Sequence, residues 1–236
     1  MAPRSRHCLV TGANRGLGFA LVQHLLARGD RVVATARHPG KATALNTLTG
    51  EHPGRLHVLP LDVASAKSRE ELARELPLVL GEDTLGLLIN NAGVLHSGER
   101  WGKLHDDILE DSLRVNAIGP LMLAQALAPL LSDGATVANI STQMASLSTR
   151  TEFRSPSYSM SKAAQNMATV QLAKAFAPRG IKVVALNPGW VRTDMGGTGG
   201  EIAPEESAAG LLRVIDGLRT EDSGGFLDWR GQPMAW

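Results

Sequence analysis

Short apolar runs alternate with longer amphipathic segments along this chain of 236 residues. The runs show little polar alternation, which is typical of strands that helices cover on both faces. Segments of helical length separate the runs, as in repeated strand–helix–strand units. The sequence therefore predicts an α/β fold with a doubly wound parallel sheet and helices on both faces. The predicted strands lie in residues 8–11, 31–36, 56–63, 84–90, 135–140 and 181–189.

Length and charge limit the kind of protein that this chain can be. Its size fits one α/β domain, and no internal repeat or long linker divides it, so we expect residues 1–236 to form a single domain. The 24 basic residues nearly balance the 23 acidic ones, which argues against a dedicated binder of nucleic acid or of anionic membranes. We expect a small molecule as the partner.

Cysteine, histidine and apolar patterns narrow the class further. The single cysteine, Cys8, lies in an apolar run and is expected to be a buried strand residue. The longest apolar stretch, residues 115–131, is interrupted by two prolines, a glycine and two amides, which is not typical of a membrane span. The seven histidines lack metal-binding spacing, so no metal site is predicted. These features indicate a soluble, cytoplasmic protein.

A glycine-rich turn follows the first predicted strand. The stretch TGANRGLG places Gly12, Gly16 and Gly18 between that strand and an amphipathic segment. Glycine permits a tight turn and lets backbone N–H groups approach a pyrophosphate at a helix N-terminus. A glycine triplet alone is weak evidence, since ordinary strand-to-helix turns also favour glycine. Its place in the first strand–helix–strand unit, however, predicts a dinucleotide site.

The end of the second predicted strand indicates which dinucleotide binds. An NAD site usually carries Asp or Glu there, about 20 residues past the glycines, to bind the ribose 2′-hydroxyl. This chain instead has Arg37 and His38, and Arg15 projects from the glycine turn. A guanidinium can hold a 2′-phosphate through two hydrogen bonds, whereas a carboxylate would repel it. We therefore expect NADP(H) rather than NAD(H); the alternative is that both arginines are solvated surface charges.

Tyr158, the only tyrosine of the chain, stands four residues before Lys162. Pro156 suits a helix start, and positions i and i+4 of a helix share one face, so the phenol and the ammonium would meet in one volume. A phenol titrates near pH 10, so acid–base chemistry near pH 7 requires a shift of about 3 units, or roughly 4 kcal/mol. An adjacent lysine and a positive nicotinamide would both lower the phenol pKa. By itself this spacing is usually an accident on a solvated helix.

Further motifs follow the glycine turn in a fixed order. They are NNAG at 90–93, RVNAIGP around Asn116, NIST at 139–142, Tyr158 with Lys162, and NPGWVRTD at 187–194. In these motifs the chain resembles the short-chain dehydrogenase/reductase family over nearly its whole length. PGWVRTDMGG and the ending SGGFLDWRGQPMAW are most similar to the branch of C-factor and sniffer-type carbonyl reductases. The resemblance implies one domain with a Rossmann-like fold.

The resemblance also implies roles for three catalytic residues. It assigns the general acid or base to Tyr158 and the binding of the nicotinamide ribose to Lys162. It assigns to Asn116 the support of a water path to the lysine.

A hydroxyl that holds the carbonyl oxygen is expected after the fifth strand. The usual serine position of the family holds Thr142, which is the first candidate, and Ser141 just before it is the second. Ser146 is a more distant candidate. Alternatively, Ser141 and Thr142 only satisfy backbone groups at the end of the strand.

The resemblance implies a wider set of residues around the cofactor. Asp62 and Val63 match the adenine-contacting pair of the family, although Asp62 would also suit a helix N-cap. Thr193 resembles the residue that binds the carboxamide end. The complete expected set is Gly12, Asn14, Arg15, Gly16, Leu17, Gly18, Arg37, Asp62, Val63, Asn90, Ala92, Gly93, Tyr158, Lys162, Pro188, Gly189, Val191 and Thr193.

Three loops are expected to border the substrate pocket, because ligands of an open α/β sheet bind beyond the carboxyl ends of its strands. They are residues 97–103, 148–157 and 195–202. The glycines of the last loop fit either a mobile lid or a floppy connection. Trp190 fits either a cover over the nicotinamide or ordinary packing.

The site residues together predict an NADPH-dependent oxidoreductase that transfers a hydride between the nicotinamide and a carbonyl or alcohol. Tyr158 would give a proton to the oxygen that Thr142 holds. The alternative is a non-catalytic cofactor-binding protein with a signalling or regulatory role, as the C-factor resemblance allows. Helical segments at 120–131 and 158–178 could pair between subunits, which would give a homo-oligomer.

Overall fold

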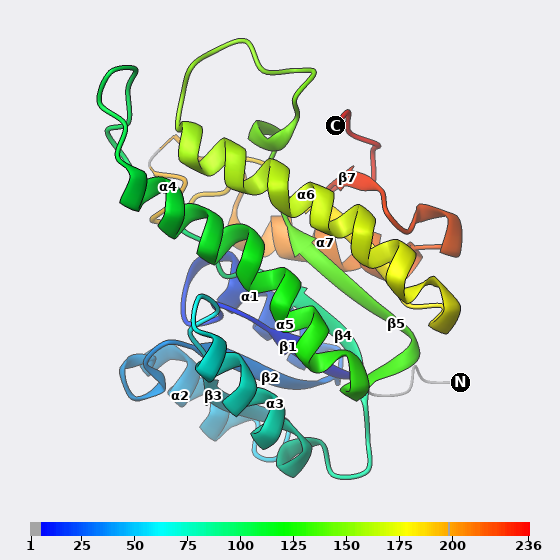
Figure 1. The fold of residues 1–236 in the computed structure, drawn as a ribbon. Coiled ribbons are helices and arrows are strands. Elements are labelled where there is room, and N and C mark those ends of the chain that lie inside the picture. The colour runs from blue at the N-terminus through cyan, green and yellow to red at the C-terminus, as the bar shows by residue number, and fades with distance from the viewer. Residues whose placement is uncertain (1–5, 198) are drawn as a thin grey trace.

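The computed structural model describes residues 6–197 and 199–236. Its strands form one parallel sheet in the order β3-β2-β1-β4-β5-β6-β7 (Figure 1). This confirms the predicted doubly wound, Rossmann-like fold. The strands are β1 (His7–Val10), β2 (Arg31–Ala36), β3 (Leu56–Pro60), β4 (Leu85–Asn90), β5 (Leu131–Ile140), β6 (Lys182–Asn187) and β7 (Phe226–Asp228).

Helices follow most of the strands. The α-helices are α1 (Gly16–Ala27), α2 (Thr43–Glu51), α3 (Ala66–Leu80), α4 (Asp106–Leu113), α5 (Gly119–Leu127), α6 (Pro156–Phe176) and α7 (Pro204–Gly217). A π-helical turn, Arg114–Ile118, joins α4 to α5. Short 3-10 turns are Pro39–Lys41, Ala128–Leu130, Gln143–Ala145, Ala177–Arg179 and Thr220–Asp222.

Two apolar cores cover the two faces of the sheet. Helices α1, α2 and α7 pack on one face, and α3, α5 and α6 pack on the other. In Figure 1, α3, α5 and α6 cross in front of the sheet, while α1 and α7 lie behind it. Cys8 and Val10 face the first core, whereas Leu9 between them faces the second. Because both sides of each central strand are buried, its sequence is apolar throughout rather than alternating.

The order of the strands reverses between β1 and β4. Strands β2 and β3 lie on one side of β1, and β4 to β7 lie on the other side. In such a sheet the loops after these two strands diverge and leave a crevice at their carboxyl ends. The glycine turn leaves β1 and the NNAG turn leaves β4, so the topology brings both motifs to this crevice.

The segment Asp106–Leu130 is one continuous run of helical turns that comprises α4, the π-helical turn, α5 and the following 3-10 turn. By length and composition it is long and apolar enough to cross a membrane. Within the fold, Leu123, Ala124 and Leu127 of α5 are buried in the second core. Length and composition of this kind are shared by membrane spans and by helices buried in a protein core. Cys8 is buried as expected, and burial raises the pKa of its thiol to about 12.

Candidate active site

The glycine turn after β1 lies directly against the turn after β4. Gly12 has a φ of +63°, and a Cβ at this position would lie 2.8 Å from the Cα atom of Ala92. At Gly18 a Cβ would lie 2.4 Å from the carbonyl oxygen of Gly12. Since real Cβ atoms do not approach backbone so closely, glycine is required at residue 12 for the contact of the two turns and at residue 18 for the close fold of the glycine turn itself.

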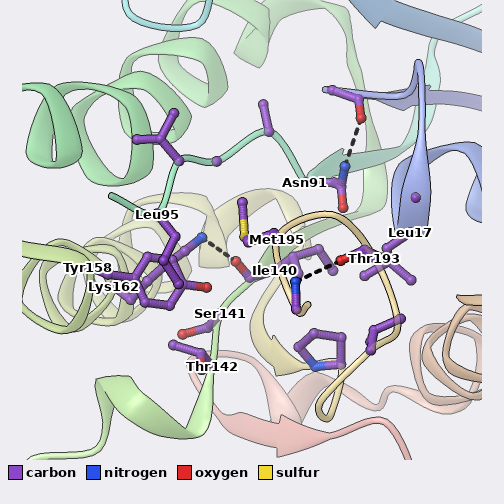
Figure 2. Close-up of a pocket in the computed structure, with 18 of the residues that line it drawn as sticks. Leu17, Asn91, Leu95, Ile140, Ser141, Thr142, Tyr158, Lys162, Thr193 and Met195 are labelled. Atoms are coloured by element: carbon purple, nitrogen blue, oxygen red, sulfur yellow. Dashed lines mark hydrogen bonds between the residues drawn. The ribbon is translucent and has the colours of Figure 1, made fainter. Parts of the chain in front are cut away.

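Asn91 ties the two turns together. Its Nδ2 atom donates to the carbonyl oxygens of Thr11 and Gly12, at 2.9 and 3.1 Å. Figure 2 shows the Asn91 amide directed at the glycine turn. The hydroxyl of Thr11 in turn accepts from the N–H groups of Asn91 and Ala92, each at 3.0 Å. These bonds hold the glycine turn in place, and neither Asn91 nor Thr11 was among the predicted site residues.

Asn90 departs from the expected cofactor set. Its side chain is buried, and its Nδ2 atom donates to Asn139 Oδ1 at 2.8 Å, inside the sheet. Asn90 does not line the cavity described below, whereas Asn91 does. The NNAG motif pointed to this turn, but it could not tell which of its two asparagines faces the crevice.

A cavity of about 890 Å³ runs from the glycine turn to the ends of β5 and β6. This volume is near the upper end of the range for ligand pockets. All residues of the expected cofactor set except Asn90 line it. They are Gly12, Asn14, Arg15, Gly16, Leu17, Gly18, Arg37, Asp62, Val63, Ala92, Gly93, Tyr158, Lys162, Pro188, Gly189, Val191 and Thr193.

Two of the three expected substrate loops reach this cavity. The loop 148–157 contributes Arg150 and Arg154, and the loop 195–202 contributes Met195. Residues 97–103 do not line it, which corrects that expectation. Instead, the Glu99 carboxylate accepts from the hydroxyl and the N–H of Ser157, at 2.7 and 3.3 Å.

The chain between β4 and α4 reaches the cavity through Val94 and Leu95 instead of residues 97–103. Leu95 is one of the cavity residues labelled in Figure 2. Apolar residues two and three positions before a polar loop carry no signal of their own in the sequence, and neither residue was predicted.

The glycines near Met195 serve close packing. A Cβ at Gly196 would lie 2.0 Å from the carbonyl oxygen of Val191, and one at Gly199 would lie 2.7 Å from the Trp190 ring. The Trp190 indole N–H donates to the Gly196 carbonyl at 2.8 Å. Trp190 lines the cavity and is 46% exposed, so it is both a wall residue and a packing partner of this loop. Residue 198 lies outside the described residues.

Thr142 and Ser141 follow β5 and point to different partners. The Thr142 hydroxyl is near enough to the Tyr158 phenol to lower its pKa, and it also accepts the N–H of Met144 at 3.2 Å. The Ser141 hydroxyl donates to Asn166 Oδ1 on α6 at 2.7 Å. Of the two candidate hydroxyls, that of Thr142 is therefore the one beside the phenol.

Tyr158 is buried at the start of α6. Burial raises the pKa of its phenol to about 12, and the nearby Thr142 hydroxyl acts in the opposite direction. In the protein alone the pKa is thus raised, not lowered as the adjacent lysine suggested, because burial removes the hydration of the phenolate. The neutral phenol, which can donate a proton, is the form that this environment favours.

Lys162 lies one turn further along α6, with its Nζ atom 5.9 Å from the centre of the Tyr158 ring. Nζ donates to the carbonyl oxygen of Ile140 at 2.7 Å and to Gln165 Oε1 at 3.0 Å. Figure 2 shows the bond to Ile140, with Tyr158, Lys162 and Thr142 on one side of the cavity. Burial lowers the pKa of the ammonium to about 7.

Asn116 sits in the π-helical turn between α4 and α5 and is fully buried. Its amide pairs with both backbone groups of Val94, each at 2.9 Å, and Nδ2 also donates to Ser161 Oγ at 3.0 Å. The side chain therefore joins the loop after β4 to α6. Gly93, next to Val94, is close to both Asn116 and Lys162, since a Cβ there would lie 3.1 Å from Asn116 Oδ1 and 3.7 Å from Lys162 Nζ.

The two arginines of the expected phosphate site differ in their partners. Arg15 forms an ion pair with Asp194 at 2.6 Å across the mouth of the cavity, and both side chains are mostly exposed. Arg37, just after β2, also lines the cavity. Within residues 6–197 and 199–236, no carboxylate lies at ion-pair distance from Arg37.

Comparisons with known proteins show the family and the fold that this chain shares. A family model described as short chain dehydrogenase matches residues 6–201. An NADPH-bound carbonyl reductase from chicken fatty liver is 38% identical with a TM-score of 0.93, over 99% of this chain and 100% of that one. The carbonyl reductase Sniffer of D. melanogaster is 31% identical with a TM-score of 0.94, over the same shares. The C-signal of Myxococcus xanthus is 44% identical over 155 residues, which are 64% of this chain and 92% of that protein.

Proposed function

The chain belongs to the short-chain dehydrogenase family of oxidoreductases, and we propose that it is an NADPH-dependent reductase of ketones or aldehydes. One observation carries the proposal: the buried phenol of Tyr158 and the neighbouring hydroxyl of Thr142 lie together on the wall of the cavity that the glycine turn borders. A carbonyl oxygen placed between them would receive one hydrogen bond from each. This is the arrangement that stabilises developing charge on such an oxygen.

The donor set of the cavity fits a phosphorylated nicotinamide dinucleotide. The glycine turn at the start of α1 suits the pyrophosphate, and the guanidinium of Arg37 suits the 2′-phosphate, with no acid at the end of β2 to repel it. The ammonium of Lys162 suits the nicotinamide ribose, and Thr193 suits the carboxamide. The chicken carbonyl reductase, which shares this fold, was crystallised with NADPH. When bound, NADPH supplies a hydride to the carbonyl carbon.

The residues of the chain supply the rest of the reaction. Tyr158 Oη gives its proton to the carbonyl oxygen, and the Thr142 hydroxyl holds that oxygen in place. The raised pKa of Tyr158 keeps the phenol protonated at neutral pH, which suits reduction rather than alcohol oxidation. Lys162, when protonated, places a positive charge beside the phenolate that forms as Tyr158 gives up its proton.

The likeness to C-signal supports a second candidate, a cofactor-binding protein with a regulatory role and no turnover. The two candidates share the dinucleotide site and differ only in whether the phenol transfers a proton.

Purified protein and the variant Tyr158→Phe distinguish these candidates. NADPH oxidation would be followed with an ortho-quinone, an aldehyde and an α-keto ester, and NADPH binding would be followed by fluorescence. We expect turnover by the starting protein and a loss of at least about 100-fold in the variant, because general acid catalysis contributes roughly 10²–10⁴. Binding of NADPH should persist, since the ring of Tyr158 is kept. Equal turnover in both proteins would refute the role of Tyr158, and binding without turnover in either would favour the regulatory candidate.

A further inference from the structure

Helix α6 buries a polar stripe against the sheet. Ser161, Lys162, Gln165, Asn166 and Thr169 are each at most 3% exposed. Buried polar side chains are stabilising only when their hydrogen bonds are made, so their partners decide what the stripe does.

Three consecutive residues, the last two of β5 and the one that follows it, bond to this stripe. Asn139 Nδ2 donates to Thr169 Oγ1 at 2.8 Å, and the next carbonyl, that of Ile140, accepts from Lys162 Nζ at 2.7 Å. The Ser141 hydroxyl then donates to Asn166 Oδ1 at 2.7 Å. Together these bonds attach α6 to the end of β5, and each of them contributes to the stability of this contact.

Gln165 is the member of the stripe that touches the ammonium. Its Oε1 atom accepts from Lys162 Nζ at 3.0 Å, and the side chain is fully buried. In the part of the chain that the structure describes, no other side-chain oxygen accepts from Nζ and no carboxylate pairs with it. Two of the three N–H bonds of the ammonium are thus held, by β5 and by Gln165, which leaves one for the cavity.

We propose that Gln165 is the positioning residue of Lys162: its amide oxygen holds the ammonium between α6 and β5, and its lack of charge leaves the lysine able to release a proton. A carboxylate at this place would hold the ammonium permanently, because a buried carboxylate and a buried amine each stabilise the charged form of the other. An apolar side chain would remove the acceptor and favour the neutral amine.

The second end of the Gln165 amide supports this role. Its Nε2 atom is buried and has no hydrogen-bond partner among the described residues. With Lys162 protonated, only the oxygen end can face the ammonium, since Nε2 is also a donor. After deprotonation, a flip of the amide by about 180° would let Nε2 donate a hydrogen bond to the lone pair of the amine. One neutral side chain can thus satisfy both protonation states of the lysine.

Few other groups face Lys162. The phenol of Tyr158 is the titratable neighbour on α6, and Ile140 of β5 contributes its backbone carbonyl. The Asn116 amide approaches from the π-helical turn beside Gly93. None of these groups carries a charge at neutral pH. Burial alone therefore lowers the pKa of Lys162, to about 7. A single charge introduced at position 165 would be the strongest electrostatic influence on the lysine.

The test uses the variants Gln165→Glu and Gln165→Met, with Thr169→Val as the matched control. Thr169 belongs to the same buried stripe and bonds to the Gln165 backbone at 3.0 Å, but it does not touch Lys162. NADPH affinity would be measured by fluorescence across pH in all four proteins, together with the melting temperature. Because this inference rests on the proposed contact of Lys162 with the cofactor, binding rather than turnover is the primary measurement.

We expect binding in the starting protein to weaken as Lys162 loses its proton. The pH at which it weakens should rise by about one unit or more in Gln165→Glu, fall in Gln165→Met and stay unchanged in Thr169→Val. The pH dependence of kcat/KM should move in the same directions. A common pH dependence in all four proteins, with only their melting temperatures altered, would overturn the proposal.

Gln165→Glu and Gln165→Met are expected to shift the pH dependence in opposite directions, so the test remains decisive if one of them fails to fold. For the variant that does fold, the pH at which NADPH binding weakens must still shift in the stated direction relative to the starting protein and to Thr169→Val. Shifted binding curves without any carbonyl turnover would leave the role of Gln165 standing and reject the reductase function.

Discussion

The Ser141 hydroxyl donates a hydrogen bond of 2.7 Å to Asn166 Oδ1, and both side chains are buried between β5 and α6. Ser141 is thereby turned away from the phenol of Tyr158. Thr142, the next residue, faces it instead. We therefore expect the Ser141 hydroxyl to contribute to stability and the Thr142 hydroxyl to contribute to the reaction.

Substitution of each hydroxyl should separate these roles. Thr142→Val should lower kcat/KM by at least about 100-fold, as expected when a donor to the reacting oxygen is lost, and Thr142→Ser should keep most of the activity. Ser141→Ala should leave kcat/KM nearly unchanged but lower the free energy of unfolding by about 1–3 kcal/mol, because Asn166 Oδ1 loses its buried donor. Steady-state kinetics and urea unfolding check both statements. A larger kinetic effect at Ser141 than at Thr142 would reverse the assignment.

The contact of the two turns makes Gly12 irreplaceable. Gly12→Ala would force a Cβ to within 2.8 Å of the Ala92 backbone at a φ of +63°, and we expect the free energy of unfolding to fall by about 1–3 kcal/mol or more. Gly50→Ala in α2 is the control, because nothing lies within 4 Å of its Cβ position, and there alanine should stabilise by up to about 1 kcal/mol. Urea unfolding of both variants tests the contrast. Similar effects at the two sites would contradict it.

The buried ammonium predicts a pH-dependent stability. Between the lowered pKa of Lys162, about 7, and its ordinary value of 10.5, the unfolded chain binds a proton that the folded protein does not. Stability from this group should therefore rise with pH across that window, by up to about 1.4 kcal/mol per pH unit. The unfolding free energy of the starting protein minus that of Lys162→Met isolates this contribution. Below about pH 7 the difference should be flat; a difference that is constant throughout would show that Lys162 keeps its ordinary pKa.

Arg37 should decide between the two nicotinamide cofactors. Arg37→Asp should weaken NADPH binding by roughly 10- to 150-fold and leave NADH binding the same or tighter, because charge-assisted hydrogen bonds contribute about 1.5–3 kcal/mol. Arg74→Asp, on the exposed side of α3, makes the same change of charge away from the cavity lining. Fluorescence titrations with both cofactors measure the preference. Equal binding of NADPH and NADH by the starting protein would refute the argument from Arg37.

The ion pair of Arg15 and Asp194 predicts a smaller effect. Both side chains are more than two-thirds exposed, so Asp194→Asn should change the unfolding free energy by less than about 1 kcal/mol. NADPH should bind a few-fold more tightly at low salt, because the variant frees a guanidinium and removes a negative charge at the cavity mouth, and high salt should abolish the gain. Weaker binding in the variant would instead mean that the pair closes over the cofactor.

Local patterns in the sequence were sufficient for β1 to β6, though not for β7, and for most of the candidate site. Apolar runs predicted β1 to β6, since strands buried on both faces need apolar residues at every position. Parallel topology then brings the carboxyl ends of β1 and β4 together, and with them the glycine and NNAG turns. The i, i+4 spacing of Tyr158 and Lys162 likewise follows from the helix alone.

Other features depended on packing between distant segments. The polar stripe of α6 has no apolar periodicity, and only the polar end of β5 explains why it is buried. The raised pKa of Tyr158 also comes from burial, which spacing to a lysine cannot reveal. The 97–103 loop was expected at the cavity because of its place in the chain, but Glu99 bonds to Ser157 outside it.

The sequence by itself determined the order of the motifs, the sheet and the edge at which the site forms. The tertiary structure decided which member of each adjacent pair faces the cavity, Asn91 rather than Asn90 and Thr142 rather than Ser141 as the partner of the phenol. Adjacent residues of an extended chain point to opposite sides, so a motif places both at the same edge. Only the packing of β4 and α6 around β5 determines which of the two is enclosed.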